Sequence, residues 1–357
     1  VSCREDFKTR GVFKGHRRRV RPKRIGLILL IMAEIDIFLR AMVEQGASDV
    51  HLVVGQSPKF ALHGHVTPIP EFKDRILESD ELKEILFTIL DAEQISTYES
   101  HWDLDFAYEI KDVARFRCNY YFQRTGYGAV MRVIPSEILT LDQLQMPPVL
   151  RSLADLRSGL VLATGPTGSG KTTTLAAMVD HINTDSSRRI ITIEDPVEFV
   201  HPNKQSIISH REVGTHTNSF KAGLRAVTRQ DADVVLVGEL RDLETMALAL
   251  SAAAMGTLVF GTLHTNSAAK TIDRIIDIFP VTQQAQVRTV LAESLAGIVA
   301  QQLLRTKGGK GRVAATEILT GNHAVASIIR EGKIERITSV IQAGKREGMQ
   351  LLDDALE

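Results

Sequence analysis

Hydrophobic and polar positions follow one pattern up to about residue 134 of this chain. The amphipathic stretch IDIFLRAMVEQ, residues 35–45, predicts a helix that ends before Gly46, and SDVHLVV predicts a strand after it. Ser79 begins a second predicted helix, which continues through ELKEILFTILDAEQI, residues 81–95. Three alternating runs follow, LDFAYEI, ARFRCNYYF and GAVMRVI. Turn residues separate these runs, so the segment predicts a small α+β unit with an antiparallel sheet.

The pattern changes after a proline-rich stretch. Pro135, Pro147 and Pro148 interrupt the segment IPSEILTLDQLQMPPVL, which we interpret as a linker. Short apolar runs then alternate with helical stretches; these runs are GLVLATG, RIITIED, DVVLVGE and TLVFGTLH. Such runs are typical of parallel strands that are buried on both faces. We therefore expect a three-layer α/β domain over residues 137–357, preceded by the α+β domain over residues 32–136.

Composition and charge narrow the class of protein. The 357 residues are 44% hydrophobic and 24% charged, as in a globular protein with a core. Residues 1–24 carry a net charge of +8, and the remainder carries −8. An acidic body argues against a nucleic-acid partner, which requires a basic face. Two cysteines provide neither a disulfide framework nor a four-cysteine zinc module. With no convincing secretory signal, we expect a cytoplasmic protein.

The basic residues near the start run into the apolar stretch IGLILLIMA, residues 25–33. Glu34 and Asp36 follow it, and it is far shorter than the ~20 apolar residues of a membrane span. We expect residues 1–31 to be a disordered extension, with the native protein starting at Met32. The alternative is a basic tail that contacts anionic lipid.

The segment GPTGSGKT, residues 165–172, fits the pattern of a phosphate-binding loop between a strand and a helix. Its glycines allow the backbone N–H groups to face phosphates, Lys171 would reach the β- and γ-phosphates, and the Thr172 hydroxyl would bind Mg²⁺. The expected nucleotide-binding residues are Gly165, Pro166, Thr167, Gly168, Ser169, Gly170, Lys171, Thr172 and Thr173. We therefore expect ATP and Mg²⁺ as ligands.

Acidic residues follow two of the other predicted strands. Glu239 comes after DVVLV, where it would orient or deprotonate the attacking water, although it could also merely begin a helix. Glu194, Asp195 and Glu198 surround Pro196 at the end of ITIED. Ligands of open parallel sheets bind at this edge, so one of these acids is expected to hold the metal or its waters. We expect Glu194 and Asp195 as metal residues and Glu194 and Glu198 among the catalytic residues. The alternative is a solvated loop.

His264 ends a further apolar run, LVFGTL. No second His or Cys stands at ligand spacing, which argues against a metal role. A lone histidine on an apolar strand is most often a core residue, but Thr262 to Asn266 is polar apart from Leu263. We therefore interpret His264 as a sensor of the γ-phosphate.

Together, GPTGSGKTTT, ITIEDPVEF, VGELRDLETM and GTLHTNSAAKTIDRIIDIFP resemble the Walker A motif, Asp box, Walker B motif and His box of the type II and IV secretion ATPase superfamily. The resemblance extends from GASDVHLVVG, residues 46–55, to the C-terminus and is strongest to the type IV pilus retraction (PilT) family. It implies a PAS-like domain before a RecA-like P-loop NTPase domain with C-terminal helices, in a ring-shaped homohexamer. It also implies that Glu239 is the catalytic base and that His264 responds to the γ-phosphate.

The resemblance also implies that arginines of the first domain reach the nucleotide. Alternation in ARFRCNYYF places Phe116 and its alternate neighbours on one face and Arg115 and Arg117 on the other. Arg117 and Arg132 match the family's phosphate-contacting arginines best, and an arginine finger of this kind would couple ATP to domain rotation. Arg115 and Arg124 fit an ordinary solvated face equally well.

Two departures from the family pattern leave the role open. Thr257 replaces a second histidine of the His box, and AVASIIRE, residues 324–331, stands where the family has AIRNLIRE. The preferred hypothesis is an ATPase motor for pilus retraction and twitching motility, at the inner face of the cytoplasmic membrane with a platform protein. The alternatives are a pilus assembly or type II secretion ATPase, a scaffold for a paralogous pilus ATPase, and a DNA translocase, which the acidic body disfavours.

Overall fold

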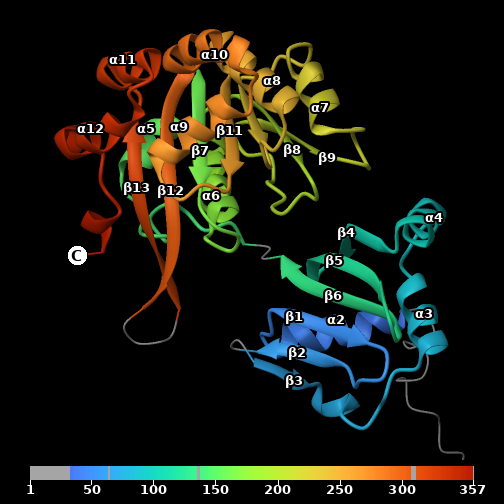
Figure 1. Ribbon diagram of the computed structural model, residues 1–357. Coiled ribbons are helices and arrows are strands. Elements are labelled where there is room, and N and C mark those ends of the chain that lie inside the picture. The colour runs from blue at the N-terminus through green and yellow to red at the C-terminus, as the bar shows by residue number, and fades with distance from the viewer. Residues whose placement is uncertain (1–32, 63–64, 135–136, 307–310, 357) are drawn as a thin grey trace, which may run out of the picture.

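A computed structural model of the chain describes residues 33–62, 65–134, 137–306 and 311–356 (Figure 1). The predicted extension over residues 1–31 and the predicted boundary between 136 and 137 fall outside these ranges or at their edge. No helix within them is long and apolar enough to cross a membrane.

The first part of the chain forms a six-stranded sheet with helices packed against it. Its elements are α2 (Glu34–Glu44), β1 (Asp49–Val53), β2 (Lys59–Leu62), β3 (His65–Pro68), α3 (Ser79–Phe87), α4 (Ala92–His101), β4 (Asp103–Ile110), β5 (Ala114–Gln123) and β6 (Gly126–Ile134). The strand order is β3-β2-β1-β6-β5-β4, and every neighbouring pair is antiparallel. The predicted antiparallel sheet is confirmed.

Strand β5 shows how alternation forms the core of this sheet. Phe116, Cys118 and Tyr120 are fully buried, whereas Phe122, on the same face at the strand's end, is 40% exposed. The opposite face of β5 carries Arg117, which remains partly exposed. One face of the strand therefore stabilises the domain and the other is free to meet the rest of the molecule.

The single helix predicted over residues 81–95 is wrong. The structure has two helices: α3 ends at Phe87, and Asp91 caps the start of α4. The Asp91 side chain accepts a hydrogen bond from the Gln94 backbone N–H, and the Gln94 side chain accepts one from the Asp91 N–H. This reciprocal capping box satisfies N–H groups that a continuous helix would bond internally.

The second part forms a seven-stranded sheet between two layers of helices (Figure 1). Its elements are α5 (Val149–Ala154), β7 (Gly159–Thr164), α6 (Lys171–Asp185), β8 (Arg189–Glu194), β9 (Ile207–Glu212), α7 (Phe220–Val227), β10 (Val234–Val237), α8 (Leu243–Ala254), β11 (Leu258–Leu263), α9 (Ala268–Asp277), α10 (Val281–Ser294), β12 (Leu295–Arg305), β13 (Arg312–Thr320), α11 (His323–Glu331) and α12 (Ile337–Ala343).

Strand β7 shows why two helical layers are needed. Leu160 and Leu162 join the apolar core beneath α7 to α11, while Val161 and Ala163 join a second core beneath α5 and α6. Both faces of the strand are buried, so its sequence is apolar throughout. The strand order is β13-β12-β7-β11-β10-β8-β9, with all neighbours parallel except β12 and β13. The sheet is therefore mixed, because β13 returns as an antiparallel hairpin that the sequence pattern did not predict.

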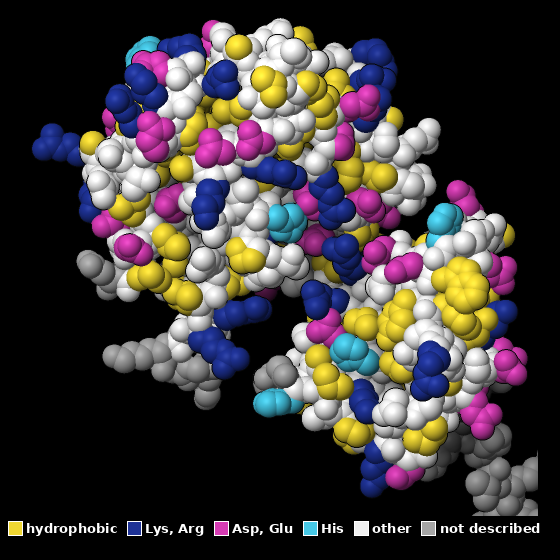
Figure 2. Space-filling view, viewed as in Figure 1, with side chains coloured by type: hydrophobic (Ala, Val, Ile, Leu, Met, Phe, Trp, Pro, Cys, Tyr) yellow, Lys and Arg dark blue, Asp and Glu magenta, His cyan; other side chains and the backbone are white. Residues whose placement is uncertain are grey.

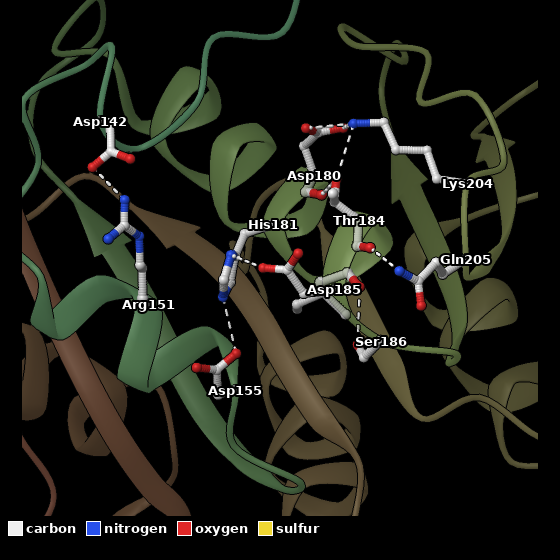
Figure 3. A network of polar contacts seen from close by, with 11 residues as sticks. Asp142, Arg151, Asp155, Asp180, His181, Thr184, Asp185, Ser186, Lys204 and Gln205 are labelled. Carbon is white, nitrogen blue, oxygen red and sulfur yellow. Dashed lines mark hydrogen bonds and ion pairs between the residues drawn. The ribbon is translucent and has the colours of Figure 1, made fainter.

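Helix α6 is fixed at its C-terminal end by polar contacts (Figure 3). The His181 ring lies between two carboxylates, with Nε2 2.9 Å from Asp155 Oδ1 and Nδ1 2.9 Å from Asp185 Oδ2. Lys204 contacts Asp180 on the same helix at 2.7 Å. Asp155 directly follows α5, so these contacts attach the far end of α6 to the segment that leads into the sheet.

Candidate active site

The phosphate-loop sequence lies between β7 and α6, where the sequence predicts it. Gly165, Gly168 and Gly170 have φ values of 142°, 78° and 87°, in the region that favours glycine. A Cβ atom at Gly165 would lie 2.3 Å from the Gln301 carbonyl oxygen, so this position excludes a side chain for steric reasons as well. Pro166 and the two residues that follow it are exposed. The loop is therefore a wrapped backbone segment open to solvent on one side.

Lys171 is the first residue of α6 and its side chain folds back over the loop. Its Nζ donates hydrogen bonds to the carbonyl oxygens of Gly165, at 2.8 Å, and Pro166, at 3.1 Å. Burial lowers the pKa of Lys171, and the charges of Glu239 and Glu198 oppose this shift. The ammonium group is thus held at the loop beside acidic groups, where a phosphate would supply stronger acceptors than neutral carbonyls.

Thr172 and Thr173 lie in the first turn of α6, half-buried beside the loop. The Ser169 hydroxyl is buried and has no hydrogen-bond partner within the described structure. Buried polar atoms of folded proteins almost always have a partner, so an unpaired hydroxyl at this loop fits a bound group that carries hydrogen-bonding atoms. The residues present therefore fit a nucleotide phosphate.

Glu239 and His264 come together because their strands are neighbours. Val237 of β10 pairs with Gly261 of β11, so the two strands end side by side. The Thr262 hydroxyl donates to the Gly238 carbonyl and fixes the two chain segments that leave the sheet. His264 Nε2 then lies 3.2 Å from Glu239 Oε1. β11 also pairs with β7, so His264 follows the strand next to the one that leads into the phosphate loop, and Glu239 follows the strand after that.

Arg241 is a member of this cluster that the sequence reasoning missed. Its Nη2 lies 2.7 Å from Glu239 Oε2. Burial opposes ionisation of Glu239, but the hydrogen bond and charge of Arg241, with a smaller contribution from His264, lower the pKa of this carboxyl below its usual value. Glu239 is consequently ionised at neutral pH. The only sequence signal for Arg241 was its position two residues after Glu239, in the same loop.

Glu194, the last residue of β8, and Asp195 and Glu198 after it occupy different environments. Glu194 is 5% exposed, and burial raises its pKa to about 7. Burial also raises the pKa of Asp195, against the opposing charge of Arg117. The Glu198 backbone N–H donates to Glu194 Oε2 at 3.4 Å, which places both acids at one turn. β8 pairs with β10, so this turn lies at the same sheet edge as Glu239.

The arginines of the first domain take separate partners. Arg117 Nη1 lies 3.5 Å from Glu198 Oε1, in the turn after β8. Arg115 lies 3.8 Å from Glu212 on β9 and also 3.8 Å from Glu109 in its own sheet. Acidic and basic side chains gather where the two parts of the molecule approach each other (Figure 2). Arg132 is the cross-strand neighbour of Arg117, but its Nε donates to Asp49 Oδ1 within its own sheet, at 2.7 Å. Arg124 is exposed beyond β5.

This fold and site define a phosphate-loop nucleotide-binding protein of the mixed α/β class. The chain belongs to the type II/IV secretion system protein family, whose model matches residues 29–350. It is 47% identical over 326 residues to the type IV pilus retraction ATPase PilT of Pseudomonas aeruginosa, covering 91% of this chain and 93% of the relative. It is also 46% identical to a twitching motility protein of Neisseria gonorrhoeae, covering 84% and 80% of the two chains.

A solved structure shares this fold over almost its whole length. It is the crystal structure of the pilus retraction motor PilT with bound ADP, with a TM-score of 0.80 and 43% identity over 91% of this chain and 96% of that one. The chain is thus a homologue of the pilus retraction ATPase, and the resemblance found in its motifs is confirmed.

Proposed function

We propose that this protein is a P-loop motor ATPase that uses ATP hydrolysis to retract type IV pili and thereby supports twitching motility. The observation that carries the proposal is the meeting of Lys171, Glu239 and His264 at one sheet edge, in a homologue of PilT. A loop that binds phosphate gives only a nucleotide site. An ionised carboxylate beside the same edge adds the group that hydrolysis requires.

Glu239 is the proposed general base. Its lowered pKa keeps it ionised, so it can accept a proton from the water that attacks the γ-phosphate. His264 contacts the same carboxylate, which supports the proposal that it responds when that phosphate is present or lost. Lys171 would exchange the two loop carbonyls for phosphate oxygens, which carry charge and bind an ammonium group more strongly.

Three residues would hold Mg²⁺ with the nucleotide: the Thr172 hydroxyl and the carboxyls of Glu194 and Asp195. Hydroxyl and carboxylate oxygens, completed by waters and phosphates, are the donors that Mg²⁺ prefers. When bound, the ion would neutralise charge that develops on the phosphates. A cation beside Glu194 would also favour its ionised form, against the burial that raises its pKa to about 7.

The domains, the oligomeric state and the partners that we propose are those of the same family. We propose a PAS-like domain over residues 32–136, a RecA-like domain over residues 137–357 and a basic extension before them, in a homohexamer. The ring would act in the cytoplasm, at the inner face of the cytoplasmic membrane, on the pilus platform protein, with a paralogous pilus ATPase as a further partner and without nucleic acid.

A glutamine substitution tests the enzymatic part of the proposal. Glu239→Gln removes the base and preserves the loop, so we expect unchanged ATP binding and a loss of at least about 100-fold in turnover. Glu244→Gln is the matched control, because Glu244 lies nearby on α8 and pairs instead with Lys221. Turnover by Glu239→Gln equal to that of the control would remove Glu239 from the mechanism.

The biological part needs a cellular measurement. In a type IV piliated host that lacks its retraction ATPase, expression of this chain should restore twitching and lower the number of surface pili. The Glu239→Gln variant should do neither. If the chain hydrolyses ATP but, in the organism from which it comes, twitching is absent and the number of surface pili stays high, retraction is the wrong assignment.

A further inference from the structure

Gln301 is a buried polar residue that the proposed chemistry does not use. It lies on β12, the neighbour of β7 on the side away from the Glu239 strand, and is 3% exposed. Its Nε2 donates to the Ser169 carbonyl at 2.7 Å, and its Oε1 accepts from the Thr174 hydroxyl at 2.9 Å. Both ends of the amide are therefore occupied, one on the phosphate loop and one on the helix that follows it.

The two contacts fix the orientation of the amide as well as its position. The Ser169 carbonyl can only accept a hydrogen bond, so the NH₂ end of Gln301 must face it. The Thr174 hydroxyl then meets the carbonyl end and donates to it. Thr174 itself is 2% exposed and belongs to the first turn of α6, where its N–H donates to the Gly170 carbonyl. The bridge thus connects the last loop residues to the start of the helix.

The carbonyl of Ser169 and the N–H of Gly170 belong to the same peptide unit. This unit is planar and trans, so its C=O and N–H point in opposite directions. By holding the Ser169 carbonyl, Gln301 keeps the Gly170 N–H pointing the opposite way, away from the Gln301 side chain. In a phosphate loop it is the backbone N–H groups that face the phosphates. Within the described residues this N–H has no backbone acceptor, as expected for a group at a helix start that is available to an anion.

Without this hydrogen bond the peptide unit would be free to rotate. Gly170 has no side chain to hinder the rotation, and its φ of 87° already lies where glycine alone is comfortable. A rotated unit would present a carbonyl oxygen to the phosphate and repel it. A side chain at position 170 could not restrict this rotation in place of Gln301, because its Cβ atom would lie only 2.8 Å from Gln301 Nε2.

We propose that Gln301 is a positioning residue of the nucleotide site, which holds the Ser169–Gly170 peptide in the orientation that binds phosphate. The inference rests on the proposed function in that the loop must bind a nucleotide. It adds to that function a residue of a different strand, 132 positions away from Ser169 in the chain.

The test measures ADP affinity, which does not depend on hydrolysis. Gln301→Met has a similar length and lacks both polar ends, so ADP should bind between about 10-fold and about 100-fold more weakly, as for the loss of one hydrogen bond to a charged group. Turnover at saturating ATP should fall much less than affinity. The control is Gln302→Met, because Gln302 points to the other face of β12 and makes no side-chain hydrogen bond among the described residues.

A second variant separates positioning from mere stability. In Gln301→Glu the carboxylate lacks a donor and faces the Ser169 carbonyl, so ADP affinity should fall at neutral pH. Protonation of the introduced carboxyl restores a donor, so affinity relative to the parent chain should recover as pH falls. Without nucleotide, the melting temperature of Gln301→Glu should differ from that of the parent chain by less than the increase that ADP produces in the parent chain.

Unaltered ADP affinity in Gln301→Met, or an equal loss in Gln302→Met, would overturn the inference. If Gln301→Met does not fold, Gln301→Glu decides: weak ADP binding at every pH would argue against positioning. A parent chain that binds ADP but does not hydrolyse ATP would refute the proposed function and leave this test intact.

Discussion

Replacing Arg117 with alanine asks whether the first domain takes part in catalysis. Arg117 contacts Glu198 at 3.5 Å, and the two side chains are 42% and 33% exposed. An ion pair this open to solvent contributes at most about 1 kcal/mol to stability. If this contact is its whole role, Arg117→Ala should lower the melting temperature by no more than about 2 °C and leave turnover unchanged.

An arginine that stabilises charge on the transferring phosphoryl group has a far larger effect. Such arginine fingers contribute roughly 10³ to 10⁵ in rate, which corresponds to at least about 4 kcal/mol in the barrier. We expect Arg117→Ala to lose turnover on this scale while retaining its fold and its affinity for ADP. The two interpretations differ by more than the error of a steady-state ATPase assay. Arg124→Ala is the control, because Arg124 is exposed beyond the end of the same strand.

Mixed assemblies then show which chain the arginine serves. Neither Arg117→Ala nor Glu239→Gln chains should hydrolyse ATP alone. If Arg117 acts on a neighbouring subunit, some interfaces of a mixture contain both intact groups and activity returns. Absence of rescue would place the arginine and the base in one chain. An Arg117→Ala protein that turns over ATP at the parent rate would refute the finger altogether.

Two further predictions concern stability. Burial lowers the pKa of His201 to about 4, so the unfolded chain binds this proton first, and His201 by itself should lower the free energy of unfolding by about 3 kcal/mol as pH drops from about 6.5 to about 4. In urea titrations the difference in unfolding free energy between the parent chain and His201→Gln should therefore change by about this amount over the range, and a difference that does not change with pH would contradict the shift. Gly165→Ala should lower the free energy of unfolding by more than about 2 kcal/mol, because backbone strain at positive φ adds to the close contact with the Gln301 carbonyl. Gly55→Ala is the control: its φ is 80° and no atom lies within 4 Å of the added Cβ, so the free energy of unfolding should fall by only about 1 kcal/mol. Equal losses in chemical denaturation would show that the contact with Gln301 relaxes freely.

The loop around Lys171 could be found in the sequence because its chemistry is local. Its glycines, lysine and hydroxyl residues are contiguous, and the strand before and the helix after them have their own patterns. The neighbourhood of Glu239 and His264 required one more step, the expectation that parallel strands end at one edge. Their adjacency depends on β11 and β10 being neighbours, which a single sequence does not specify.

Contacts over long separations escaped the sequence reasoning for a physical reason. Gln301 and Gln302 are consecutive and chemically identical, and only the pairing of β12 with β7 decides which of them reaches the loop. Arg132 matched a family position, yet its nearest acid is Asp49 in the neighbouring strand. The split between α3 and α4, in contrast, carried a readable signal, since Asp91 and Gln94 have the spacing of a capping box.

Helix α6 begins at the phosphate loop and, near its other end, contacts the chain that follows α5. It has 15 residues, which gives it a length of about 22 Å. Lys171 lies at the N-terminal end of α6, and His181, whose ring contacts Asp155 and Asp185, lies near the C-terminal end. A tilt of about 10° pivoting on the phosphate loop displaces the opposite tip of a rod this long by about 4 Å. Because Asp155 follows α5, such a tilt would move the His181 contact with Asp155, so one rigid helix links the position of the phosphate loop to that of the chain after α5.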